Sequence, residues 1–268
     1  MAIKLGVVTY QWAAEWDLPT LIKNCTEAGF DGVEARYTHK HGIAIKLDKQ
    51  QRADVKKMFD DSPVKFVGPG TGCEYQSEDH GVLQRNIDET KQWVLLSQEL
   101  GGSGVKVRPN KFVKGEKKEK TIERIGLALR ECGQFGADHG QEIRVEVHGI
   151  GTQMPEVIRA IMDVADHPNV RVCWNSNPED KVKGSVKQSF DLLKNKFGHT
   201  CHIHDLYDPD YPFQELLSLL KKENWDGYCL MECSYMLPNM SVEGKGLTVA
   251  VRLMKYYRKM FDMMLERG

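Results

Sequence analysis

Residues 143–177 read IRVEVHGIGTQMPEVIRAIMDVADHPNVRVCWNSN and contain one complete strand–helix–strand unit. Residues 143–147 form a short β-branched run that predicts a strand, and residues 154–165 carry apolar side chains at helical spacing. A second β-branched run, 170–174, follows the turn-forming residues DHPN. Strands that alternate with helices in this way indicate a parallel sheet of the α/β class.

The same alternation continues through the chain in both directions. Strands are expected at residues 3–9, 32–37, 64–67, 105–107, 143–147, 170–174, 200–204 and 227–231. Helices are expected at about 18–29, 48–61, 82–100, 120–138, 154–165, 186–197, 213–222 and 248–266. Eight such units without a linker-like break predict a single (β/α)8 TIM barrel domain over residues 1–268.

An open doubly wound sheet is the main competing fold, and it favours a glycine fingerprint in the first strand–helix turn. That turn, TYQWAAEWD at residues 9–17, contains no glycine. The glycine-rich segment GPGTG at 68–72 has the wrong spacing for a dinucleotide fingerprint or a P-loop. We expect it to pack tightly or to approach a ligand.

Composition excludes several classes of function. The 268 residues include 37 Lys and Arg against 38 Asp and Glu, a net charge of −1 that does not favour a nucleic-acid partner. No apolar stretch is long enough to span a membrane, and the N-terminal residues do not resemble a signal peptide. Seven scattered cysteines without a CxxC pair are typical of reduced thiols, so a cytoplasmic protein is expected.

Polar residues collect at the C-terminal ends of the predicted strands, where a barrel of this kind carries its active site. They are Glu34, Arg36, Glu74, Lys106, Arg108, Glu146, His148, Asn175, Asn177, His202, His204, Asp205 and Glu232. Residues i and i+2 of a strand share a face, so Glu146 and His148 are expected to point the same way. Lys106 and Arg108 either contact a substrate or form ion pairs with Glu34 or Glu74.

Four of these residues occupy matching positions on four consecutive strands: Glu146, Asn175, His202 and Glu232. Two carboxylates, one amide oxygen and one imidazole suit Mn²⁺, Mg²⁺, Co²⁺ or Zn²⁺. A glutamate buried without a partner is costly, and this also favours a divalent metal ion.

The segments GFDGVEARY (29–37), VEVHG (145–149), HIHDL (202–206) and LMECS (230–234) together resemble the xylose isomerase-like TIM barrel superfamily, the sugar phosphate isomerase/epimerase group. The resemblance implies a divalent metal held by Glu146, position 175, His202 and Glu232. The sequence departs from the family pattern at Asn175, where aspartate is usual. It also has Pro178 where epimerases of free ketoses tend to have histidine. A neutral ligand at 175 predicts weaker metal binding and a stronger Lewis acid.

The predicted function is a metal-dependent isomerase or epimerase of a keto-sugar. Glu146 and Glu232 are expected to act as acid and base through a metal-bound enediolate. Aromatic rings stack on sugar faces, so Tyr10 and Trp12 are expected to form a pocket wall. The remaining predicted substrate contacts are Lys106, Arg108, His148 and His204. The resemblance also makes a homo-oligomer an expectation.

Three alternatives stay open at this point. The same metal and base could eliminate the aglycone from a 3-keto-glycoside, which would make the protein a lyase or deglycosidase. Metal-assisted phosphodiester cleavage is disfavoured, because that chemistry would need more metal ligands and a positive face for DNA. A sugar-binding barrel in which Asn175 marks a lost metal is the non-enzymatic alternative.

Overall fold

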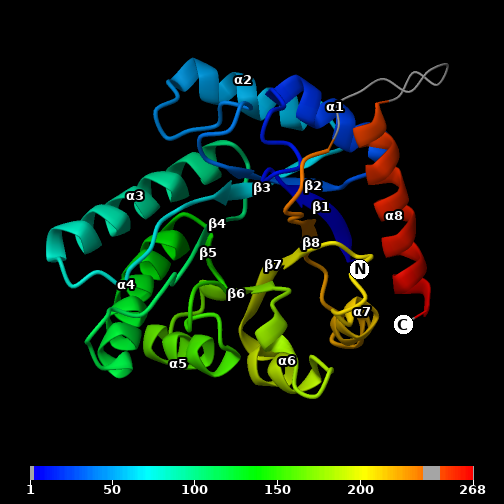
Figure 1. The fold of residues 1–268 in the computed structure, drawn as a ribbon. Helices are drawn as coiled ribbons and strands as arrows, with labels where there is room; N and C mark the ends of the chain where they lie inside the picture. The colour runs from blue at the N-terminus through cyan, green and yellow to red at the C-terminus, as the bar shows by residue number, and fades with distance from the viewer. Residues whose placement is uncertain (1–2, 238–247, 268) are drawn as a thin grey trace.

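A closed parallel barrel forms the centre of the molecule. The computed structural model describes residues 3–237 and 248–267. Each strand pairs with the next, and β1 also pairs with β8, so the order β1 to β8 closes on itself (Figure 1). The strands are β1 (Lys4–Val8), β2 (Gly32–Arg36), β3 (Lys65–Gly70), β4 (Gly104–Val107), β5 (Glu142–Glu146), β6 (Val170–Asn175), β7 (Phe197–Ile203) and β8 (Tyr228–Met231). The predicted (β/α)8 fold is confirmed.

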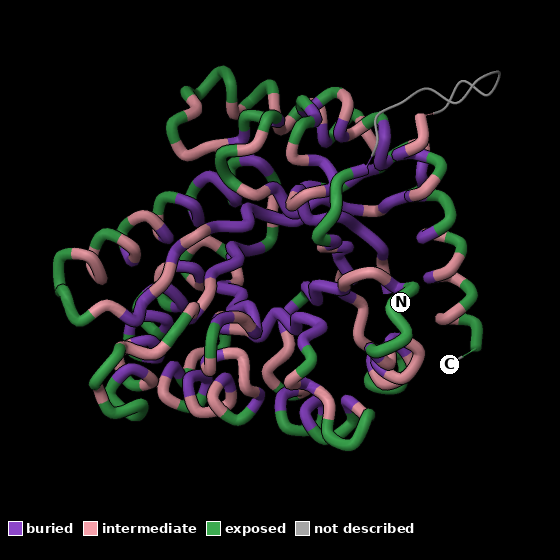
Figure 2. The backbone as a smooth tube through the Cα atoms, viewed as in Figure 1, coloured by how far each residue is buried: buried purple, intermediate pink, exposed green. Residues whose placement is uncertain are grey.

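A helix follows each strand and lies on the outside of the barrel (Figure 1). Figure 2 shows buried residues along the strands and the inner sides of the helices, with exposed residues on the outer sides. The helices are α1 (Leu18–Ala28), α2 (Lys49–Asp60), α3 (His80–Glu99), α4 (Lys118–Asp138), α5 (Pro155–Ala165), α6 (Lys187–Leu193), α7 (Phe213–Lys222) and α8 (Val249–Arg267). Within the described ranges, no helix is both long enough and apolar enough to cross a bilayer. All seven cysteines are buried and free.

Local sequence sets where the helices begin and what they bury. The carboxylate of Asp17 accepts a hydrogen bond from the Thr20 N–H at 3.0 Å, which caps the start of α1. Gly29 ends the helix in the left-handed region at φ 76°. On α8 the buried positions include Met254, Tyr257 and Phe261, which recur at helical spacing and cover the barrel wall.

The helix predicted over residues 186–197 is shorter than expected. α6 ends at Leu193, a 3₁₀ turn covers Lys194–Lys196, and Phe197 begins β7, where it pairs with Val172. The Phe197 ring packs edge-on against Trp174 at a centroid distance of 5.6 Å and against Phe190 at 5.2 Å. These contacts come from three separate elements, so helical periodicity alone could not place the boundary.

The glycine-rich segment packs tightly, as expected, but its first part belongs to β3 rather than to a loop. Gly68 has φ 152°, and a Cβ there would lie 2.0 Å from the Gly104 carbonyl oxygen. Only a residue without a side chain lets β3 and β4 approach this closely. The glycine therefore serves barrel closure.

Gly68→Ala is expected to destabilise the protein by about 3 kcal/mol, because overpacking and backbone strain act together. Urea unfolding would measure the loss. Gly42→Ala is the matched control, since Gly42 also has a positive φ of 77° but no atom lies within 4 Å of the place that an alanine Cβ would take. Equal losses for the two variants would contradict the steric argument.

Candidate functional site

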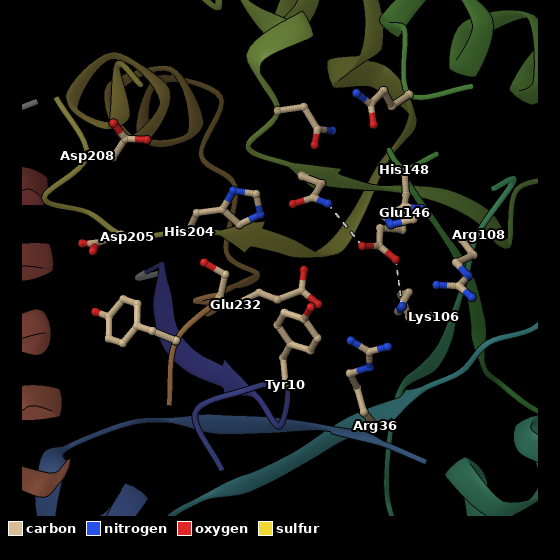
Figure 3. A pocket seen from close by; sticks show the side chains of 15 residues that line it. Tyr10, Arg36, Lys106, Arg108, Glu146, His148, His204, Asp205, Asp208 and Glu232 are labelled. Atoms are coloured by element: carbon tan, nitrogen blue, oxygen red, sulfur yellow. Dashed lines mark hydrogen bonds and ion pairs between the residues drawn. The ribbon is translucent and has the colours of Figure 1, made fainter. Parts of the chain in front are cut away.

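A cavity of about 570 Å³ opens at the C-terminal ends of the strands. Its wall includes Tyr10 after β1, Lys106 of β4, Glu146 of β5 and Glu232 after β8 (Figure 3). The predicted collection of polar residues at this end of the barrel is therefore brought together around one space.

Glu146 and Glu232 line this cavity, and the buried His202 lies next to both of them. One potential ligand atom from each lies within 4.8 Å of the other two. The Nδ1 atom of His202 is 3.1 Å from Glu232 Oε2 and 3.6 Å from Glu146 Oε1. The His202 side chain is wholly buried, which fixes the direction of its Nδ1. These three residues form a candidate metal site.

Asn175, the fourth expected ligand, lies beside this cluster. Its register partner on β7 is His202, and its Nδ2 donates a hydrogen bond to Glu146 Oε1 at 3.2 Å. Its Oδ1 is buried and has no hydrogen-bond partner among the described residues. A buried oxygen without a donor suits a cation, because leaving it unsatisfied is costly.

The charges around the cluster also fit a divalent cation. Lys106 Nζ donates to Glu146 Oε2 at 2.8 Å, and both side chains are almost completely buried. Glu34 and Glu232 contribute two further carboxylates next to His202. One ammonium thus faces three carboxylates, and buried charges are stable only when they are balanced. A bound M²⁺ would restore neutrality.

The pKa of His202 lies well above its usual value. Burial by itself lowers this pKa, but contact with Cys173 and the carboxylates of Glu34 and Glu232 outweighs burial. The pKa of Glu146 lies well below its usual value: burial raises it, and the opposing effects of Lys106 and His202 are larger together. Without a metal ion, a proton on His202 supplies the positive charge at this site. A metal ion must displace that proton to bind, so metal affinity is expected to rise with pH.

Glu34 has a position that sequence reasoning missed. The sequence predicts for it only an ion pair with Lys106 or Arg108. Its Oε1 lies 3.2 Å from Nε2 of His202, on the side of the ring away from Glu232. A Cβ at Gly70 would lie 2.8 Å from the same Oε1, so that glycine leaves room for the carboxylate. Neither Glu34 Oε1 nor His202 Nε2 has a hydrogen-bond partner among the described residues, so Glu34 acts on the His202 ring through its charge, which raises the pKa of the imidazole.

Glu34→Gln is therefore expected to weaken divalent-metal binding by about tenfold or more, since glutamine has the same shape without the charge. Titration with Mn²⁺, followed by electron paramagnetic resonance, would measure the dissociation constant. Glu119→Gln, at an exposed position of α4, is the matched control. An unchanged dissociation constant for Glu34→Gln would contradict this effect of the Glu34 charge.

The cavity wall contains most of the predicted substrate contacts: Tyr10, Lys106, Arg108, His148 and His204. Burial is the largest influence on both histidines and lowers the pKa of each, so neutral imidazoles face the cavity. Lys106 is paired with Glu146 rather than with Glu34 or Glu74, the two partners considered from sequence.

Trp12 lies behind the cavity wall and is not among the described residues that line it. The side chain is 1% exposed, and its ring meets Tyr235 and Tyr257 edge-on at centroid distances of 6.0 and 5.0 Å. Tyr235 itself lines the cavity. Trp12 therefore supports an aromatic ring of the wall from behind.

A second buried network, centred on Asp180, holds the loop after β6. Tyr211 donates its hydroxyl hydrogen to Asp180 Oδ2 at 2.8 Å, and the Asn177 N–H donates to the same oxygen at 2.8 Å. Trp174 Nε1 donates to the Tyr211 oxygen at 3.0 Å. Burial raises the pKa of Asp180 to about 8, despite these hydrogen bonds. Because Asn177 lines the cavity, Asp180 positions part of its wall.

The raised pKa of Asp180 predicts a stability that falls as pH rises. The folded state holds this proton up to about pH 8, whereas the ordinary value is 3.8, so stability is lost between those values. The expected slope from this group is about 1.4 kcal/mol per pH unit. Asp180→Asn should remove that slope in urea unfolding at pH 5–8, whereas Asp138→Asn at an exposed site of α4 should keep it. An unaltered slope in Asp180→Asn would contradict this assignment.

The fold and the site define a (β/α)8 barrel with a candidate Glu–His–Glu metal site. The chain belongs to the xylose isomerase-like TIM barrel family, whose model matches residues 22–259. No curated protein sequence matches the chain.

Solved structures share the fold at low sequence identity. An L-ribulose 3-epimerase matches with a TM-score of 0.79 and 16% identity, covering 99% of this chain and 95% of its own. An IOLI protein with a bound zinc atom matches with a TM-score of 0.76 and 18% identity, and the match covers 99% of each chain. The 3-keto-D-glucoside 4-epimerase from E. coli matches with a TM-score of 0.74 and 14% identity, and the match covers 98% of this chain and 99% of the epimerase. Two of these three structures are sugar epimerases.

Proposed function

We propose that this protein is a metal-dependent isomerase or epimerase of a keto-sugar, with Glu146 and Glu232 as its acid and base. One observation carries the proposal: the carboxylates of Glu146 and Glu232, which border one cavity (Figure 3), both lie close to the Nδ1 atom of His202. The sugar epimerases among the structural matches support the same reaction class.

Glu146, Asn175, His202 and Glu232 would hold the metal ion. When bound, a divalent ion supplies a Lewis acid that makes the C–H bond beside a sugar carbonyl more acidic. Mn²⁺, Mg²⁺, Co²⁺ and Zn²⁺ all accept this set of oxygen and nitrogen ligands.

The side chains of the protein itself supply proton transfer. The pKa of Glu146 and the pKa of Glu232 both lie below the usual value, because burial is outweighed at Glu146 by Lys106 and at Glu232 by His202. Both carboxylates are thus ionised at neutral pH and able to accept a proton. One glutamate removes the proton from carbon and becomes protonated. The other takes up a proton from solvent and delivers it to the opposite face of the sugar, so one proton leaves the substrate carbon and one is added to it.

Three donors are available for the negative charge that develops on the substrate oxygens. The Lys106 ammonium and the neutral imidazoles of His148 and His204 all border the cavity. Fixed donors stabilise such charge strongly, because they need no reorganisation during the reaction.

Hydrogen exchange in D₂O tests the proposal without knowledge of the product. The protein with Mn²⁺ would be incubated with a panel of ketohexoses and 3-keto-glucosides, and NMR would record deuterium entering the carbon beside the carbonyl. The proposal requires enzyme-dependent exchange in at least one of these sugars. Absence of exchange from the whole panel would count against it.

A lyase acting on 3-keto-glycosides is the second candidate, and His148 favours it. This residue lies two positions after Glu146 and borders the same cavity, and burial lowers its pKa. A neutral imidazole can take the proton from carbon and return it to the departing aglycone oxygen. Incubation with p-nitrophenyl 3-keto-glucoside separates the two reactions: a lyase releases p-nitrophenol, and an epimerase leaves the glycoside intact.

A further inference from the structure

The cavity carries its uncompensated positive charge on one side. Arg36 at the end of β2 and Arg108 after β4 both line it, on the Lys106 side of Glu146, whereas Asp205 and Asp208 lie beyond His204 on the other side (Figure 3). We propose that the substrate is an anionic sugar whose carboxylate or phosphate group is bound by Arg36 and Arg108. This inference rests on the proposed function, because it assumes that a sugar occupies the cavity.

Arg36 is held in place without neutralisation of its charge. Its guanidinium lies over the ring of Tyr10, with 4.7 Å between the guanidinium carbon and the ring centroid. Its backbone N–H donates to Thr9 Oγ1 at 2.8 Å, which fixes the end of β2. Within residues 3–237 and 248–267, no carboxylate forms an ion pair with it. A stacked guanidinium with free N–H groups is prepared for an oxyanion.

Arg108 is compensated only weakly. The nearest carboxylate is that of Glu74, with 4.0 Å between Arg108 Nε and Glu74 Oε2. Neither atom has a hydrogen-bond partner among the described residues, although both are buried. A buried N–H of a charged group without an acceptor is costly, and an anionic ligand would supply the acceptor.

The other charged groups of the cavity do not play this part. Lys106 is already bonded to Glu146 at 2.8 Å, so its charge is balanced within the catalytic cluster. Asp205 accepts hydrogen bonds from the Tyr257 hydroxyl at 2.5 Å and from the Tyr207 N–H at 2.9 Å. Asp208 accepts from the Asp210 N–H at 2.8 Å. The acidic side is thus engaged with the protein, and the two arginines remain for the ligand.

The separation of positive and negative charge across the cavity would set the orientation of the bound substrate. The reacting carbon would lie between Glu146 and Glu232, and the anionic group would extend toward Arg36 and Arg108. Two guanidiniums can each offer a pair of parallel N–H donors to a carboxylate or a phosphate. A neutral sugar leaves both arginines without acceptors, and a site built to bond a charged group discriminates against ligands that lack it.

Three ketoses that differ at one carbon test the proposal by calorimetric titration of the Mn²⁺-loaded protein. D-Fructose is neutral, D-fructuronate carries a carboxylate at carbon 6, and D-fructose 6-phosphate carries a phosphate there. We expect one anionic ligand to bind at least about tenfold more tightly than D-fructose, with the advantage falling as NaCl is raised. The anionic ligand that binds more tightly shows whether the substrate carries a carboxylate or a phosphate group.

Substitution of both arginines provides the second arm. In Arg36→Gln/Arg108→Gln the affinity ratio between the anionic and neutral ligands should fall to within about threefold of unity, while Arg85→Gln at an exposed position of α3 should keep the full ratio. Equal affinities for all three ligands in the unaltered protein, or an unchanged ratio in the double variant, would overturn the proposal. Binding is scored separately from deuterium exchange, so loss of the anion preference and loss of the proposed reaction are distinguishable.

Discussion

Replacement of Glu146 or Glu232 by glutamine is expected to lower turnover by at least about 10³-fold, the size of a lost general acid–base contribution. Glutamine fills nearly the same volume but cannot accept a proton from carbon. The Glu146 side chain approaches His202 Nδ1 from β5, and the Glu232 side chain approaches the same atom from the end of β8. Because their positions differ, neither glutamate can take over proton transfer from the other. Deuterium exchange at the carbon beside the carbonyl is the direct measurement.

Both glutamates are also candidate metal ligands, so metal binding needs its own measurement. Each variant would be assayed over a range of Mn²⁺ concentrations up to saturation, and its metal content determined at the end point. Loss of turnover that persists at full occupancy assigns proton transfer to that glutamate. A variant with near-normal turnover would remove that glutamate from the mechanism, and Glu119→Gln on the outer surface serves as the unaffected control.

Removal of divalent ions is the second change with a large expected effect. Chelation should abolish deuterium exchange, and adding Mn²⁺, Mg²⁺, Co²⁺ or Zn²⁺ should restore it. It should also lower the melting temperature, because only Lys106 and a proton on His202 then balance the three carboxylates of Glu34, Glu146 and Glu232. An ion present at 100 times its dissociation constant stabilises the folded state by about 2.7 kcal/mol. Differential scanning calorimetry of the metal-free and metal-loaded protein would measure the shift.

The variant Asn175→Asp tests metal dependence in the opposite direction, by strengthening metal binding. A third carboxylate next to Glu146 and His202 should bind the ion about tenfold more tightly, since each added ligand charge raises affinity for a hard cation. Full turnover in the chelated protein would contradict metal dependence. Absence of metal binding in both the unaltered protein and Asn175→Asp would favour the sugar-binding barrel that sequence reasoning left open.

Sequence reasoning placed the strand ends well, because local patterns carry that information. Alternation within a strand put Glu146 and His148 on one side of β5, and both border the cavity. The end of the helix before β7 could not be predicted from the sequence. Phe197 continues a helical pattern in the sequence, yet it pairs with Val172 and packs on Trp174 in the folded protein. Contacts made across elements decided that boundary.

The sequence by itself determined the barrel and the residues that reach its C-terminal end, since hydrophobic periodicity and strand alternation are local properties. Only the tertiary structure decided which of those residues meet. It paired Lys106 with Glu146, put Glu34 against the far nitrogen of His202, and left Arg36 and Arg108 facing the cavity. The physical reason is barrel closure: the stagger of the strands sets which side chains share a layer, and this depends on tight contacts such as that of Gly68 with Gly104.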